Sequence, residues 1–392
     1  QTVTHTYETQ SAIETSVRQS YRLSIAQALD LVPEILKADI TQAAGLVTVA
    51  NIWEIDLSNW ENTLPTQTIY TYKKVETINN VKRLVTYTDS FVRFGEDNIF
   101  ESRQITYYDE VTTINGLKTA LVTKSYIMVG EEMILDSLQY TYWQKDITTS
   151  DGVIRTVKII ETRFELGGNY YLDIVQYVYY KTENMIVDPL NRTTQAMSVT
   201  VIENYTGVFG NQIIDKFPTT IQKEYKIAKD GKVITVRAFY EPGLDIPLAI
   251  QFNYKEEEKG KRLLNVIENY ENGILTFTQK TWKALEEVKN PITGESQGRR
   301  LVTYTKTIEP GLEVYPSLNR SWKNIENIKE IATLITYSLN YDYGSLVPTS
   351  FTVSYRALED DGVVYSYIDN YELGIHAGSQ KIHKEIEDGK LI

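Results

Sequence analysis

A short phrase occurs three times along this chain, and its recurrence restricts the possible folds more than any other feature. "VIENYTGV" begins at Val201, "VIENYENGI" at Val266 and "YIDNYELGI" at Tyr367. The last two phrases belong to longer copies, because residues 233–283 align without gaps on residues 334–384 with 16 of 51 positions identical. We interpret the phrase as the same junction between a strand and a turn in successive copies of one structural unit.

The first half of the chain repeats on a smaller scale. Residues 90–108 and 125–143 are identical at 8 of 19 positions, and a third copy begins at Gly167. The period is 35 to 37 residues, which is the length of one hairpin. Repeats of this kind predict an antiparallel meander that arose by duplication of a hairpin.

Turns and composition both favour long strands. Turn dipeptides, such as Asn-Gly at 115–116 and Asp-Gly at 230–231, separate segments of mostly 10 to 15 residues. Tyrosine is abundant at 29 of 392 residues, and aromatic and β-branched side chains suit a pleated surface. We therefore predict a mainly β protein, a long-stranded antiparallel meander of repeated hairpins that forms a sandwich or a large twisted sheet. The sequence leaves open whether the sheet is single, stacked or closed.

A second marker accompanies the repeats. It consists of a proline, six further residues, a tyrosine and then a lysine or arginine. We interpret it as a strand that begins at the proline, which need not donate to the ladder there, and that closes with the ring and the cation. In the first half Leu135 and Leu172 replace the proline, and Tyr142 and Tyr179 keep the distance. With the recurring Asn-Tyr pairs, the residues assigned to the repeat structure are Pro65, Tyr72, Pro218, Tyr225, Pro247, Tyr254, Asn269, Tyr270, Pro348, Tyr355, Asn370 and Tyr371.

The N-terminal ten residues predict an extended arm. Val3, His5 and Tyr7 alternate with threonines, as in a strand, and these three are the candidate interface residues. Ten extended residues span about 33 Å, enough to reach a neighbouring copy. The same arm would bury a similar area if it folded back on its own sheet, so the motif leaves both arrangements open.

A helical region is predicted after the arm. Ser11 and Glu14 match a capping box, and apolar residues at spacings of three and four follow as far as Val32, where Pro33 ends or kinks the helix. A second helix is expected from Glu34 to about residue 44. We expect this region to cover a sheet, with a partner-binding or membrane-surface helix as the alternative. A weaker helical pattern covers residues 322–331.

The repeats suggest three units. Residues 1–45 hold the arm and helices, residues 46–205 a first β-repeat domain, and residues 206–392 a second. The second contains the internal duplication, at 217–290 and 316–392.

No catalytic, cofactor or metal signature is found. The absence of cysteine excludes disulfides and thiolate metal sites, and the cations are dispersed in a chain of net charge −12, which disfavours nucleic acid. No apolar run approaches the roughly 18 residues of a membrane helix. His376 and His383 are seven residues apart, hence on opposite faces of a predicted strand, and the third histidine, His5, is remote in sequence. We expect no enzyme, cofactor or metal.

Acidic residues, glycosylation triplets and a dense aromatic group are each compatible with a function but do not indicate one by themselves. Glu203, Glu268 and Asp369 recur at equivalent junctions, yet nothing marks them as a pair for sugar cleavage. Glycosylation triplets begin at the residues Asn191, Asn204 and Asn319. Core packing explains most of the densest aromatic group, and stacking on sugars is the alternative. This group is Tyr140, Tyr142, Trp143, Tyr177, Tyr179 and Tyr180.

These observations predict a structural protein that associates with copies of itself through β-strand contacts. A filament, sheath, surface layer or virion part would fit, outside the cell or at its surface, and residue 1 being Gln favours a chain whose leader has been removed. The alternative is a module that holds a lipid or glycan between the N-terminal helix and a curved sheet. An outer-membrane barrel is a third hypothesis, which charged residues on both faces disfavour.

Overall fold

A computed structural model describes most of the chain. The described residues are 2–10, 13–53, 64–94, 97–129, 132–166, 169–206, 208–209, 212–213, 217–258, 262–311, 317–328, 331–359, 363–383, 386–387 and 390–391.

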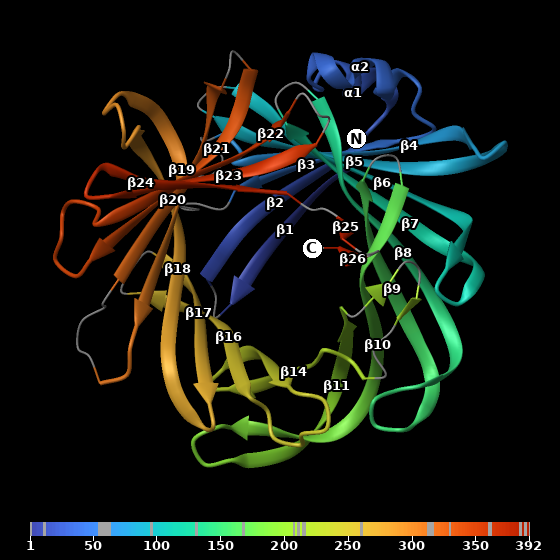
Figure 1. The fold of residues 1–392 in the computed structure, drawn as a ribbon. Helices are drawn as coiled ribbons and strands as arrows, with labels where there is room; N and C mark the ends of the chain where they lie inside the picture. Colours follow the sequence, from blue (N-terminus) through green and yellow to red (C-terminus); the bar gives the residue numbers. More distant parts are fainter. Residues whose placement is uncertain are drawn as a thin grey trace.

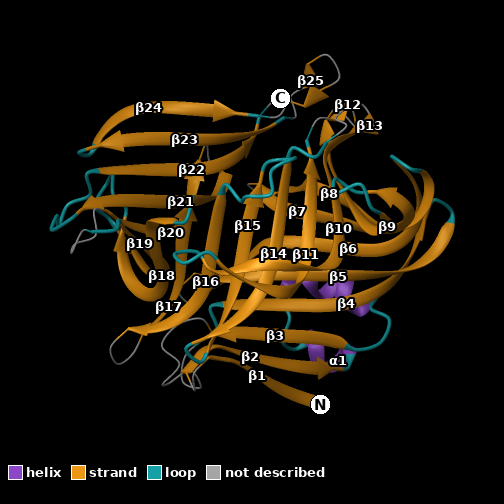
Figure 2. Cartoon of the chain, turned by 90° about the horizontal axis from the view of Figure 1, so that it is seen from below, coloured by secondary structure: helices purple, strands orange, loops and turns teal. Residues whose placement is uncertain are grey.

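Within the described residues, one antiparallel sheet of 22 strands dominates the fold, and each of its strands pairs with the next strand of the sheet along the chain. The predicted long-stranded β meander is therefore confirmed. In Figure 1 the sheet curves from β5–β10 on the right, through β11 and β14 at the bottom, to β16–β24 on the left. The sheet is not closed, and Figure 2 shows its first and last strands at different margins of the molecule.

The first eleven strands belong to this sheet. They are β1 (Thr2–Gln10), β2 (Ile13–Leu23), β3 (Val47–Trp53), β4 (Gln67–Ile78), β5 (Val81–Phe94), β6 (Asp97–Thr113), β7 (Gly116–Val129), β8 (Glu132–Thr148), β9 (Ile154–Leu166), β10 (Asn169–Asp188) and β11 (Thr193–Tyr205).

Eleven more strands complete it. They are β14 (Thr220–Lys229), β15 (Lys232–Tyr240), β16 (Ala249–Glu258), β17 (Arg262–Glu271), β18 (Ile274–Lys289), β19 (Ser296–Ile308), β20 (Ser317–Ile328), β21 (Ile331–Asp342), β22 (Ser350–Leu358), β23 (Val364–Glu372) and β24 (Ile375–Ile382). Two short hairpins lie outside it, β12 (Val208–Phe209) with β13 (Gln212–Ile213) and β25 (Ile386–Glu387) with β26 (Lys390–Leu391).

The long duplication has the same pairing in both copies. Phe252 pairs with Val236 and, at an offset of 101 residues, Val353 pairs with Tyr337. Both copies also place a register shift immediately before the tyrosine of the phrase, at Tyr270 and at Tyr371. Because β11 pairs with β14, the sheet continues across position 205/206, and the division into three domains stays a prediction.

The predicted helical region is only partly correct. Residues 13–23 form β2, which pairs with both β1 and β3, and the helices are α1 (Ile25–Leu29) and α2 (Glu34–Thr41). A spacing of four fits a strand as well as a helix, because residues four apart share a face in both. The capping box in the described part of the chain is formed by Ser24 and Gln27, and Ser11, which was predicted to cap the helix, lies outside the described residues. Pro33 does precede a second helix, as predicted.

The weaker helix prediction at 322–331 is wrong. Residues 317–328 form β20, which pairs with β21 over its full length and with β19 over five residues. The pairing with β21, which covers residues 322–328, outweighs the three-residue spacing of isoleucines in this segment. Among the described residues, no helix is long and apolar enough to cross a membrane.

The two helices cover part of the sheet, as expected. Ala28 of α1 and Leu36 and Ile40 of α2 are each 0% exposed, in a cluster with Val47 and Tyr72 of the sheet. This interface is filled by packed side chains.

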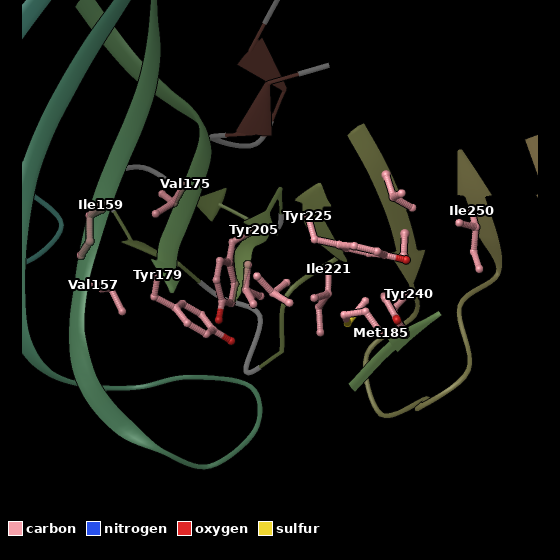
Figure 3. Close-up of a cluster of buried hydrophobic side chains, with 14 of the residues drawn as sticks. Val157, Ile159, Val175, Tyr179, Met185, Tyr205, Ile221, Tyr225, Tyr240 and Ile250 are labelled. Atoms are coloured by element: carbon pink, nitrogen blue, oxygen red, sulfur yellow. The ribbon is translucent and has the colours of Figure 1, made fainter. Parts of the chain in front are cut away.

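Two further apolar clusters lie along the sheet, one from β7 to β17 and one from β18 to β23. In Figure 3, Tyr179, Tyr205 and Tyr225 of the larger cluster gather over the same region of the curved sheet.

The C-terminal strands also touch the first half of the sheet. Lys323 of β20 lies 2.5 Å from Glu101 of β6, and Arg356 of β22 lies 2.6 Å from Asp136 of β8. Glu101 and Asp136 occupy equivalent positions in two copies of the first-half repeat, and each is the extra residue at a register shift. The acids at equivalent bulges of two successive copies therefore form ion pairs with cations on β20 and β22.

Candidate functional site

The recurring phrase places a buried carboxylate at the centre of a hydrogen-bond cluster. Glu203 of β11 is 0% exposed. It accepts hydrogen bonds from the hydroxyls of Tyr179 at 2.8 Å and Tyr205 at 3.0 Å. The backbone N–H of Ser150 donates to the same carboxylate at 2.9 Å, and the Ser150 hydroxyl donates as well. The carboxylate therefore has partners from three parts of the chain.

The second phrase repeats this arrangement. Glu268 of β17 accepts hydrogen bonds from Tyr254 at 2.7 Å and from Tyr270 at 3.0 Å. As with Glu203, one tyrosine lies on the preceding strand of the sheet. The second tyrosine lies on the strand of the acid itself, two residues after it. In the third phrase the acid is the shorter Asp369, which accepts from the hydroxyl of Ser379 at 2.5 Å.

Buried acids elsewhere hold hairpin turns in the same way. Glu161 of β9, also 0% exposed, accepts the N–H of Ile114 in the β6–β7 turn at 3.0 Å. Asp109 of β6 accepts from the Asn79 side chain in the β4–β5 turn at 3.0 Å. Turn N–H groups that fold onto an apolar surface need an acceptor, and these carboxylates supply it. They therefore fix the turns over the curved sheet.

A charged network joins α2 to the sheet. Asp39 of α2 binds Arg103 at 2.8 Å and Lys74 at 2.9 Å, and Arg103 also binds Asp89 at 2.6 Å. Burial opposes the charge of Asp39, yet hydrogen bonds and charges from Lys74 and Arg103 outweigh it and hold its pKa below the usual 3.8. Burial raises the pKa of Asp89, while Arg103 and the Tyr72 hydroxyl act in the opposite direction.

The buried carboxylates of these clusters are enclosed by the protein. Asp89, Glu161 and Glu203 are each 0% exposed, so water and substrates do not reach them. Their hydrogen-bond partners come from the protein itself. Within the described ranges, no three His, Asp or Glu side chains gather so that they could hold a metal ion.

A cavity of about 250 Å³ lies between the β10–β11 turn, the β15–β16 loop and the β17–β18 turn. Small-molecule pockets usually measure about 300–1,000 Å³, so this cavity suits water or a very small molecule and not a lipid. It does not lie under the helices. Its lining includes Arg192, Tyr240, Asp245, Ile250 and Tyr270.

The edges of the sheet are the other candidate site. In the part of the chain that the structure describes, β1 pairs only with β2, and β24 pairs only with β23. An edge strand presents unpaired N–H and C=O groups, which can pair with another strand. Seven of the eight residues of β24 are exposed.

The structure places the predicted interface residues on one of these edges. Val3, His5 and Tyr7 lie on β1, opposite Tyr21, Gln19 and Val17 of β2 in the same chain. The arm therefore folds back on its own sheet, and only its outer side is open to a neighbour. His376 lies on the opposite edge strand, β24, within 3.0 Å of the Ser379 hydroxyl, and the ring of His383 packs on Tyr365.

The proline of the repeat marker lies just before its strand and not at its first residue. Pro65, Pro218, Pro247 and Pro348 each stand two residues before β4, β14, β16 and β22. In all four copies the residue after the proline donates its N–H to the preceding strand. These bonds join Thr66 to Ile52, Thr219 to Asn204, Leu248 to Phe239 and Thr349 to Asn340, at 2.7–2.9 Å. A proline here removes no ladder bond.

The tyrosine of the marker is the sixth residue of its strand and does not close it. Tyr72 and Tyr225 are buried, Tyr254 and Tyr355 half-buried. Tyr72 donates to the carboxylate of Asp89, as Tyr254 does to Glu268, whereas Tyr225 donates to the backbone carbonyl of Ile186.

The Asn-Tyr pairs of the phrase lie near the ends of β17 and β23. Asn269 is 4% exposed and donates to Thr276 at 2.8 Å, and Tyr270 and Tyr371 pack on Phe252 and Phe351. Asn370 is half-buried on β23.

Sequence reasoning missed the role of the acids. Glu203 and Glu268 recur with their phrase, but their tyrosine partners on the neighbouring strand follow only from the register. The available signal was the acid that stands two residues before the tyrosine in each phrase. Comparison with family models finds no match for this chain, and comparisons with curated proteins and with solved structures find none either.

Proposed function

We propose that this protein is a non-enzymatic structural component that polymerises by pairing the open edges of its sheet. The observation that carries the proposal is the 22-strand sheet whose edge strands, β1 and β24, each pair on one side only among the described residues. Addition of a strand to such an edge is a general mode of protein association. The partner is a second copy of this chain.

The strand count supports growth from head to tail. In an antiparallel sheet with an even number of strands, the two edge strands run in opposite directions. β24 of one copy therefore lies antiparallel to β1 of the next, and the alternation continues across the junction. Such an interface joins two different surfaces of the chain, so repeated addition produces a ring if the last edge meets the first and an open filament otherwise.

The composition of the two edge strands also supports association through the edges. Soluble proteins protect exposed edges with charges, prolines or very short strands. Of Lys, Arg, Asp and Glu, the nine-residue strand β1 contains a single residue, Glu8. The eight-residue strand β24 also contains a single one, Lys381. Neither contains proline. An assembly outside the cell or in a virion would use such edges.

The ligand-binding alternative has less support. It requires space between the helices and the sheet, where Ala28, Leu36 and Ile40 are fully buried. The cavity described above lies elsewhere and is small.

Adjacent proline substitutions test the β24 edge. Neighbouring residues of a strand direct their N–H groups to opposite sides, so one of Gln380→Pro and Lys381→Pro removes an N–H that faces β23 and the other removes one that faces the open edge. The edge-facing substitution is expected to abolish association while the monomer keeps its thermal stability. Sedimentation velocity measures the association, and Gln380→Ala and Lys381→Ala are the controls. Association of both proline variants at the wild-type level contradicts the proposal.

Mixing experiments test the direction of growth. Thr4→Pro and His5→Pro form the equivalent pair on β1. If growth is head to tail, a β24-blocked variant and a β1-blocked variant stay monomeric alone and form only dimers when mixed. If β1 pairs with β1, the β24-blocked variant alone dimerises and the head-to-tail arrangement is excluded.

A further inference from the structure

A single row of side chains crosses the face of the sheet opposite the buried tyrosines, from β2 to β22. Each member lies two strands further along the sheet and two residues further along its strand than the one before. The row, called here the outer row, consists of Arg22, Lys73, Tyr108, Trp143, Tyr180, Lys226, Lys255, Lys283, Lys323 and Arg356.

The registers between neighbouring strands establish this geometry step by step. Lys73 pairs through Thr86 with Thr106, and Tyr108 follows two residues later. Tyr108 pairs through Leu121 with Thr141, and Trp143 follows two residues later. The same step leads from Trp143 to Tyr180 and from Tyr180 to Lys226. The remaining cations follow with identical steps.

Three neighbouring members of the row are aromatic and strongly exposed. Tyr108, Trp143 and Tyr180 are 64%, 61% and 69% exposed. The residue before each of them, Tyr107, Tyr142 and Tyr179, is buried in the core. The exposed rings therefore add nothing to core packing. All the remaining members of the row have a cation at this position.

The row is a surface of defined charge and spacing. Strands about 4.8 Å apart and residues about 3.4 Å apart place the Cα atoms of successive rings about 12 Å from one another. Lys73 and Arg22 flank the rings on one side and Lys226 on the other, in a chain whose net charge is −12. Thr106 and Thr141 lie two residues before Tyr108 and Trp143 on the same strands, and Thr200 of β11 pairs with Tyr180.

We propose that the outer row binds a linear acidic polysaccharide across β4 to β14. Exposed rings stack on the apolar faces of sugars, and a regular ring spacing suits a ligand whose chemical unit repeats. Cations at both ends favour carboxylate or sulfate groups on that ligand. Single-stranded nucleic acid, a polyanion whose bases also stack on exposed rings, is the competing ligand that the experiment compares. The site lies on a face of the sheet, so pairing at the edges leaves it accessible.

Removal of the rings tests the proposal. The variant Tyr108→Ala/Trp143→Ala/Tyr180→Ala is expected to bind polygalacturonate at least roughly thirtyfold more weakly than the wild-type chain, at roughly three- to tenfold per ring. Calorimetry measures the affinity, and circular dichroism verifies the fold. Tyr343→Ala, which removes a 56% exposed ring outside the row, is the matched control and should bind like the wild type.

Charge and ligand class are tested separately. Lys73→Gln/Lys226→Gln should reduce the salt dependence of binding to polygalacturonate and leave binding to its fully methyl-esterified form unchanged. Three results would overturn the proposal. They are no binding of polygalacturonate by the wild-type chain, equal binding by the triple variant, and tighter binding of oligothymidylate than of polygalacturonate.

Discussion

Replacement of Glu203 by Gln is expected to destabilise the folded chain by about 3 kcal/mol, because it leaves buried donors without a full partner. The carboxylate accepts the N–H and hydroxyl of Ser150 and the hydroxyls of Tyr179 and Tyr205. A glutamine keeps one acceptor oxygen and turns an NH₂ group towards the remaining donors. Chemical denaturation measures the loss. Hydrogen exchange should show faster opening of the β8–β9 turn.

The control is Glu110→Gln on β6, which alters an exposed acid and should change stability by no more than about 0.5 kcal/mol. Tyr205→Phe removes one of the donors and should cost about 1–2 kcal/mol. An unfolding midpoint of Glu203→Gln equal to that of Glu110→Gln would show that the carboxylate does not hold the turn.

Alkaline pH is expected to unfold the protein cooperatively between about pH 10 and pH 12. Burial raises the pKa of Tyr107 to about 12 and that of Tyr240 to about 12, in each case helped by nearby acids. Burial and the charge of Glu203 also raise the pKa of Tyr179 above its ordinary value of 10.0. A phenol whose pKa is raised by folding stabilises the fold fully below pH 10. It loses this contribution as the pH rises towards the folded-state pKa.

Tyrosinate absorbance and circular dichroism, followed together, test this expectation. The absorbance of buried tyrosines should rise in the same pH interval in which the β signal falls. The chain in concentrated urea serves as the control, and its phenols should titrate near pH 10. Full ionisation of the tyrosines near pH 10 with an unchanged β signal would contradict the account of the buried phenol–carboxylate clusters.

Much of the fold could be predicted from repeats and turns, because a hairpin copied many times leaves the same signals many times. The helical prediction failed at residues 13–23 because Ile13, Val17 and Tyr21 are four apart, which suits both periodicities. Only the pairing of β2 with β1 and β3 decides between them. In β20 the full-length pairing with β21 overrides the local helical pattern in the same way.

The candidate sites were less accessible to sequence reasoning, since they depend on register. The recurrence of Glu203 was visible, but its contact with Ser150 joins residues 53 positions apart. The repeat marker contains two cations of the outer row, Lys73 and Lys226, each directly after the tyrosine of the marker. Their alignment with Tyr108, Trp143 and Tyr180 in one row emerges only when the shifts between neighbouring strands are known.

The most direct test of the edge-pairing account is negative-stain microscopy of the unmodified chain over a range of concentrations. The account predicts filaments or rings that lengthen or become more numerous with concentration, because each added copy presents a new β24 edge. Sedimentation on the same samples should show a matching rise in mass. A chain that remains monomeric at every concentration, with both edges open, would contradict the account.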